Sequence, residues 1–208
     1  MLEDTIDSAI SFRAGALVLK GPRVEVEGAS GRLRLLDEAL RTRDLAAADT
    51  LRSALLADRE AGRDAVLDRF CRLVHGLFRR HSGIRIALAP SADLLTTPNA
   101  NELAWFFDEV AEPSRLGYWH ATGVCAIRDF LGLDRASDWM EPREGHIMGA
   151  HLSDASGLEA GLLPGAGTVD WGAVRETLSP TVPRILRLAP GTDLPMIREA
   201  IRWLEAGR

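Results

Sequence analysis

Short apolar runs alternate with helical patterns along this chain, and that alternation constrains its fold more than any other feature. The runs are apolar throughout, which is typical of strands covered on both faces, whereas a half-exposed strand alternates apolar and polar residues. Repeated strand–helix alternation predicts an α/β fold with a parallel sheet. The five expected strands are residues 16–20, 84–88, 116–120, 147–152 and 184–188.

Helical patterns fill the intervals between these runs. Residues 28–64 carry Ala, Leu and interleaved charges without a strand run, which predicts helix with a break near Asp44. Further on, Asn99 followed three residues later by Glu102 forms a capping-box pattern at the start of another helix. The expected N-caps of the later helices are Asn99, Asp170 and Asp193.

The composition is that of an ordinary globular chain. Its 208 residues are 46% hydrophobic and 26% charged, with a net charge of -5, and no linker divides them, so we expect a single domain over residues 1–208. The mild acidity argues against a nucleic-acid partner, because phosphate backbones need clustered Lys and Arg. No run approaches the roughly 20 apolar residues that would span a membrane.

The expected location is the cytoplasm. The N-terminal stretch MLEDTIDSAI has acidic residues where a signal peptide needs basic ones. Cys71 and Cys125 lie in apolar surroundings outside any C-x-x-C pair, which predicts buried free thiols in a reducing compartment.

The stretch YWHATGVCAI, residues 118–127, combines a strand end with unexpected side chains. It predicts a buried strand that passes through a Thr-Gly turn into an apolar segment. Polar chemistry in α/β proteins is usually found at such strand ends. Here the sequence offers His120, but then Ala121 and Val124 where carboxylate and imidazole groups are expected.

Together with this stretch, two later segments resemble the xylose-isomerase-like TIM-barrel superfamily, which includes sugar-phosphate isomerases and epimerases and apurinic-site endonucleases. The resemblance covers residues 5 to 205 approximately. Its most specific part is 147–171, where His-Leu-x-Asp, a Gly turn, Pro-Gly-x-Gly and Asp-Trp follow in the family's order. The segments are YWHATGVCA, HLSDASGLEAGLLPGAGTVDW and RILRLAP.

The resemblance implies a shortened or incomplete TIM-like barrel. A complete barrel has eight strands and about 250 residues, whereas this chain offers five to six parallel strands and lacks the family's first two and its last. Open strand edges and an uncovered apolar face are costly. We therefore expect a homodimer, or a partner protein, to cover the open edges. Alternatively, the additional helical residues 28–64 cover the gap left by the missing strands.

The resemblance also implies that a metal site has been lost. Strand ends in the family present carboxylates and imidazoles to divalent metals, which prefer such ligands. Of the matching positions in this chain, one keeps that chemistry, His151, while the glycines, proline and tryptophan of 157–171 are retained. We therefore expect no metal and no cofactor. The departures from the family pattern are Lys20, Ala89, Ala121, Val124, Ala160, Gly161 and Arg187.

Lys20 and Arg187 place two cations where the resemblance implies metals. They could hold a small anionic ligand, a phosphate or carboxylate, without metal; alternatively they reach solvent or pair with Asp154 or Glu141. The other three candidates also have structural interpretations, because buried polar groups normally find hydrogen-bond partners nearby. His120 could cap the end of its strand, His151 could be held by hydrogen bonds in the core, and Asp154 could orient a neighbouring backbone amide. The candidate ligand-binding residues are Lys20, His120, His151, Asp154 and Arg187.

Three functions remain open. The leading hypothesis is a metal-free, non-catalytic homologue of sugar phosphate isomerases and epimerases that acts as a binding or assembly subunit. The second is an active, metal-independent sugar or sugar phosphate isomerase or epimerase with His151 or Lys20 as catalytic group, because a lysine at a dry strand end can have a depressed pKa and serve as a base or Schiff-base nucleophile. The third is a structural module that completes a partner's barrel.

Overall fold

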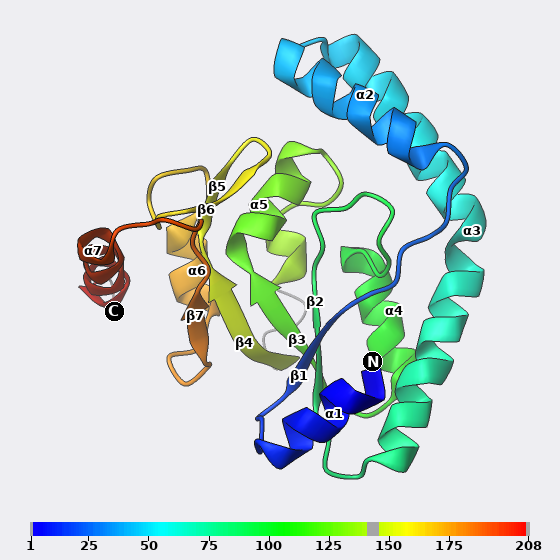
Figure 1. Cartoon of the computed structure of the whole chain (residues 1–208), viewed down its shortest axis with the longest axis vertical. Coiled ribbons are helices and arrows are strands. Elements are labelled where there is room, and N and C mark those ends of the chain that lie inside the picture. Colours follow the sequence, from blue (N-terminus) through cyan, green and yellow to red (C-terminus); the bar gives the residue numbers. More distant parts are fainter. Residues whose placement is uncertain (1, 141–145, 207–208) are drawn as a thin grey trace.

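An open sheet of five parallel strands forms the centre of the computed structural model, which describes residues 2–140 and 146–206 (Figure 1). All five predicted strands are confirmed. The sheet has edges at β1 and β7, which do not pair with each other among the described residues, so it is an incomplete barrel. Its order is β1 (Leu17–Lys20), β2 (Ile86–Ala89), β3 (Leu116–Ala121), β4 (Ile147–Leu152) and β7 (Arg184–Leu186).

Helices follow most of the strands, as the alternation predicted. The largest core lies between the sheet and two of them, where Phe70 and Val74 of α3 and Phe106 of α4 pack against Leu88 and Tyr118 of the sheet. None of the helices in the described ranges is long and apolar enough to cross a lipid bilayer. The helices are α1 (Leu2–Ser11), α2 (Ala29–Thr42), α3 (Leu45–Arg80), α4 (Ala100–Val110), α5 (Thr122–Phe130), the 3-10 helix η1 (Ser137–Trp139), α6 (Trp171–Thr177) and α7 (Leu194–Ala206).

The break predicted near Asp44 separates α2 from α3. Arg43 adopts a left-handed conformation (φ 59°), and the Asp44 side chain caps α3 by accepting from the Ala47 amide at 3.1 Å. The two helices pack on each other and on Leu95 and Ile127. Figure 1 places α2 far from β7, so this helical hairpin leaves that sheet edge open.

The expected Thr-Gly turn after β3 is wrong. The strand runs to Ala121 and α5 begins directly at Thr122. Gly123 is a helical residue, and a Cβ there would lie 2.6 Å from Ser153 Oγ, so it is glycine because α5 closely approaches the chain just after β4. A two-stranded antiparallel hairpin, β5 (Asp154–Ser156) and β6 (Glu159–Leu162), was also not predicted.

The loops after β1 and β2 are bonded to each other at the carboxyl end of the sheet. The Val24 amide donates to the Leu95 carbonyl and the Thr97 amide to the Pro22 carbonyl, both at 2.9 Å. Gly21 lies so close that a Cβ would come within 1.7 Å of the Thr97 carbonyl oxygen. This pairing fixes the end of β1, the strand that carries Lys20.

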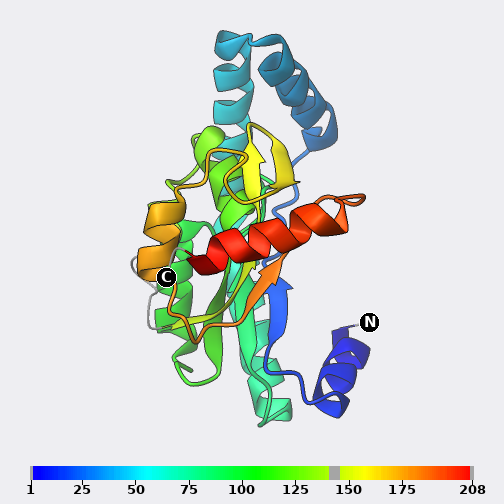
Figure 2. The same cartoon turned by 90° about the vertical axis from the view of Figure 1, so that its left-hand side faces the viewer.

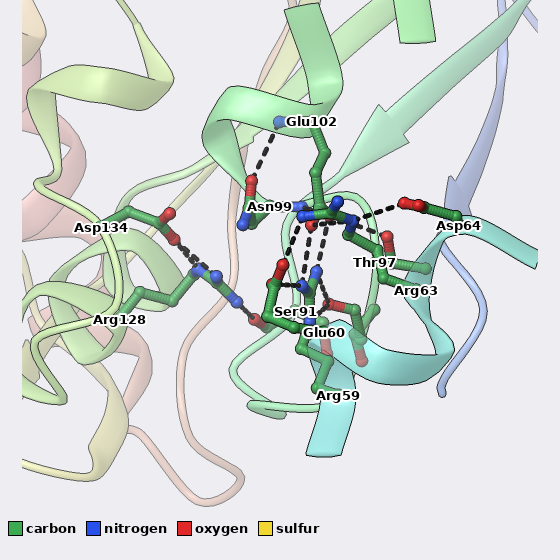
Figure 3. Close-up of polar contacts among 11 residues, drawn as sticks. Arg59, Glu60, Arg63, Asp64, Ser91, Thr97, Asn99, Glu102, Arg128 and Asp134 are labelled. Atoms are coloured by element: carbon green, nitrogen blue, oxygen red, sulfur yellow. Dashed lines mark hydrogen bonds and ion pairs between the residues drawn. The ribbon is translucent and has the colours of Figure 1, made fainter. Parts of the chain in front are cut away.

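A buried ion pair fastens α3 to the start of α4 (Figure 3). Arg59, 2% exposed, donates from Nη1 and Nη2 to the two carboxylate oxygens of Glu102 at 2.7 and 2.6 Å. Asn99 and Glu102 form the predicted capping box, and the Thr97 hydroxyl donates to the same carboxylate at 2.8 Å. Burial opposes ionisation of Glu102, but the bonds from Arg59 and Asn99 outweigh it and hold its pKa below the ordinary value.

Candidate functional site

Side-chain alternation divides the sheet into two faces. Leu19 of β1 and Tyr118 of β3 belong to the core under α3 and α4. Because successive side chains of a strand point to opposite faces, Lys20 and Trp119 point to the other side. We call this side the inner face.

His151 also belongs to the inner face. Its ring centroid lies 5.4 Å from that of Trp119, and in the sheet register it stands between Ala121 of β3 and Ile185 of β7. Arg187 follows β7 by one residue, and its amide donates to the Leu152 carbonyl at 2.9 Å. The carboxyl ends of β1, β4 and β7 thus carry one basic or imidazole side chain each.

Lys20 and Arg187 both lie within electrostatic range of His151, and we call these three residues the inner-face cluster. The pKa of His151 lies below its ordinary value, first because the ring is half-buried and then because the charges of Arg187 and Lys20 act on it. Lys20 and Arg187 are exposed, so the dry surroundings expected for Lys20 are not found. Lys20 is the only lysine of the sequence.

Neither cation of the cluster has a carboxylate partner within residues 2–140 and 146–206. Glu141, one of the two expected partners, lies outside the described residues. Asp154, the other, is fully occupied elsewhere. The positive charges of both residues therefore act on His151 without a neighbouring carboxylate of the described residues to offset them.

Trp119 provides the apolar floor beside the cluster. Its indole packs so closely on β4 that a Cβ at Gly149 would lie 2.1 Å from the ring. The indole is 8% exposed, and its Nε1 is buried without a hydrogen-bond partner in the described parts of the chain.

Asp154 serves as an acceptor for backbone amides, one of the two interpretations of the sequence. It is fully buried and accepts from the amides of Ala155, Gly165 and Val169 and from the indole Nε1 of Trp171, at 2.8 to 3.0 Å. Burial opposes its ionisation, but these bonds hold its pKa below the ordinary value. The carboxylate organises the loop before α6, and its predicted ligand-binding role stays a prediction.

His120 lies on the opposite face from the cluster. It is 1% exposed, and its Nδ1 lies 3.0 Å from the Tyr118 hydroxyl and 3.9 Å from the Cys125 sulfur. Sequence reasoning missed this approach of cysteine to histidine. Burial raises the pKa of Cys125 to about 12, so the thiol is protonated at neutral pH and is no nucleophile.

The cluster does not fit a divalent metal ion. It offers one imidazole between two cations, and positive charge repels a metal. Among the described residues, no group of three or more His, Cys, Asp or Glu side chains is placed to hold one.

Two solved structures align with this chain. One, described as a D-tagatose 3-epimerase-like protein, aligns with a TM-score of 0.53 and 16% identity over 98% of this chain and 84% of its own. The other, the IOLI protein with a binding zinc atom, has a TM-score of 0.47 and 14% identity over 96% and 78% of the two chains. No family model and no curated protein matches. The first likeness shows the fold alone, and with the open five-stranded parallel sheet it agrees with the shortened TIM-like barrel that the sequence predicted.

Proposed function

We propose that the chain is a metal-free, non-catalytic binding or assembly subunit with a sugar isomerase/epimerase type of fold. Its ligand is a small anion, held at the inner-face cluster. The observation that carries this proposal is the convergence of Lys20, His151 and Arg187 from three strands, with both cations exposed. An ammonium group and a bidentate guanidinium fork suit a phosphate or a carboxylate.

Anion binding and protonation of His151 are coupled in this proposal. Burial and the two cations disfavour the imidazolium form of His151. An anion between the cations offsets their field and therefore raises the pKa of the ring. By linkage, the affinity for the anion rises as pH falls.

The single lysine makes the test specific. Reductive ¹³C-methylation labels Lys20 and the chain's α-amino group and keeps the positive charge of Lys20. We expect inorganic phosphate and glucose 6-phosphate to shift the Lys20 methyl signal saturably, whereas glucose leaves it in place. A phosphate titration without any shift contradicts the proposal.

A pair of arginine variants measures the contribution of the guanidinium. Arg187→Gln should weaken phosphate binding about ten- to a hundredfold in calorimetry, because a charge-assisted hydrogen bond contributes about 1.5 to 3 kcal/mol. Arg79→Gln on α3 is the matched control, since Arg79 is also exposed. Equal affinities of the two variants would exclude Arg187 from the site.

The alternative function is a metal-independent isomerase or epimerase, which the placement of Lys20 beside His151 supports. In such an enzyme the Lys20 amine condenses with the sugar carbonyl to an imine and releases water. Borohydride then reduces the imine to a stable amine. A sugar adduct on Lys20 in mass spectrometry, with turnover that is lost in Lys20→Met, would favour the enzyme over the binding subunit.

For the assembly role we propose a second copy of this chain as the partner. Ile185 of the edge strand β7 is 49% exposed, and Ile201 and Trp203 of α7 are also exposed; Figure 2, taken with Figure 1, shows α7 on the flank outside α6 and β7. A two-fold interface must be complementary to itself, and α7 carries Arg198 next to Glu199 between its apolar residues. Sedimentation should show a dimer that Ile201→Glu dissociates, whereas a compact, stable monomer contradicts both this dimer and a module that completes a partner's barrel.

We also propose the cytoplasm as the location. Cys71 and Cys125 are buried free thiols, as predicted, and free thiols are typical of reducing compartments. Cell fractionation with an antibody against the chain tests this, and recovery outside the cytoplasm would contradict it.

A further inference from the structure

A cavity of about 630 Å³ opens on the outer side of the sheet, between α5, η1 and the start of α6. Its walls are mostly apolar and include Ala126, Met140, Val169 and Val174. Sites for small organic molecules have this size and this kind of lining. The cavity shares no residue with the inner-face cluster.

His120 is a buried polar residue in the wall of this cavity. Both polar contacts of its ring run through Nδ1, to Tyr118 and Cys125, and Nε2 has no hydrogen bond within the described residues. Burial lowers the pKa of His120 to about 4, so the ring is neutral at pH 7. Nε2 therefore offers one hydrogen-bond donor or acceptor to a bound molecule.

Three charged side chains line the cavity: those of Asp129, Asp170 and Arg135. The Asp129 carboxylate accepts from the Ala136 amide at 3.3 Å, and that of Asp170 accepts from the Ala173 amide at 3.1 Å. The Arg135 guanidinium is exposed and has no partner among the described residues. A ligand carboxylate can thus pair with Arg135.

We propose that this cavity binds a small organic acid with an apolar body. Its carboxylate pairs with the Arg135 guanidinium, its body contacts the apolar walls, and His120 Nε2 bonds to a polar atom of the ligand where one is present. This site goes beyond the anion site of the inner face and uses different residues from a different face of the sheet.

The probes are hexanoate and benzoate, each compared with its neutral amide. Titrations of the full chain are followed by the backbone amide signals in two-dimensional NMR. We expect saturable shifts confined to α5, η1 and the start of α6, with the amides binding about tenfold more weakly because they lack the charge that pairs with Arg135. If neither acid binds at millimolar concentration, the proposal is overturned.

Three variants locate the binding. Arg135→Gln should lower the affinity for benzoate about tenfold, whereas Arg79→Gln, an exposed arginine on α3, should leave it unchanged. Ala173→Phe places a ring into the cavity and should abolish binding in a folded protein. Benzoate binding that survives Ala173→Phe, or that is equal in the two arginine variants, would overturn the assignment.

Discussion

Cationic side chains have opposite surroundings in two regions of this molecule. Arg59, between α3 and α4, is 2% exposed and meets both oxygens of Glu102 (Figure 3). Lys20 and Arg187, on the inner face, are exposed and lack a carboxylate partner within the described residues. A buried cation is tolerated only when it is paired, so the role of Arg59 is to stabilise the folded structure. The inner-face cations are free to meet a ligand.

The largest expected effect comes from breaking the buried pair. Glu102→Ala leaves Arg59 buried without its carboxylate and removes the capping box, so we expect a loss of about 3 to 5 kcal/mol in the free energy of unfolding. Urea denaturation measures it. Glu109→Ala, an exposed acid on the same helix, is the matched control and should change stability by less than about 0.5 kcal/mol. A comparable small loss in Glu102→Ala would mean that the pair is not structural.

Removal of the Asp154 carboxylate should cost about 3 kcal/mol, because it leaves buried N–H donors without an acceptor. The contribution of this group is present above its ordinary pKa and is lost as pH falls through the lower pKa of the folded state. Asp154→Ala should leave phosphate affinity at the inner face unchanged in the protein that remains folded. If the affinity falls there, the predicted ligand role of Asp154 is supported instead.

His120 should make stability depend on pH. The folded-state pKa of about 4 lies below the ordinary value of 6.5, so the unfolded chain takes up the proton first as pH falls. The free energy of unfolding therefore decreases between pH 6.5 and pH 4, by up to about 3 kcal/mol from this residue. His120→Gln should remove this contribution to the pH dependence. Urea denaturation of the wild-type chain and of the variant at pH 7 and pH 4 measures the difference. Equal pH dependence in both would contradict the burial of a neutral ring.

The central strand β3 could be predicted because burial on both faces produces a continuous apolar run in the sequence, here residues 116–120. The capping residues Asn99 and Asp170 could also be predicted, since capping depends on neighbours within one turn. The prediction of a turn at Thr122 and Gly123 was wrong because Gly123 is required by a close contact with Ser153, which is distant in sequence. Sequence rules based on neighbouring residues cannot predict such long-range contacts.

The site was predictable in part. Lys20, His151 and Arg187 were found from strand ends and from the family resemblance, but their convergence depends on the sheet and not on their spacing. The pairing of Asp154 with the loop before α6 follows from the fold of a hairpin that the sequence did not reveal. The approach of His120 to Cys125 has one signal that was overlooked, a spacing of five residues across a direct strand-to-helix junction.

The smallest expected effect concerns the stability of the inner face itself. Arg187→Gln and Lys20→Gln should change the free energy of unfolding by less than about 0.5 kcal/mol without an anion, because exposed and unpaired charges contribute little to folding. In phosphate, the wild-type chain should gain stability through binding, and each variant should gain less. Thermal unfolding with and without phosphate measures this difference. If Arg187→Gln lowers the free energy of unfolding by more than about 2 kcal/mol in phosphate-free buffer, Arg187 has a structural role like that of Arg59. If the variant loses only the stabilisation by phosphate, Arg187 binds the ligand.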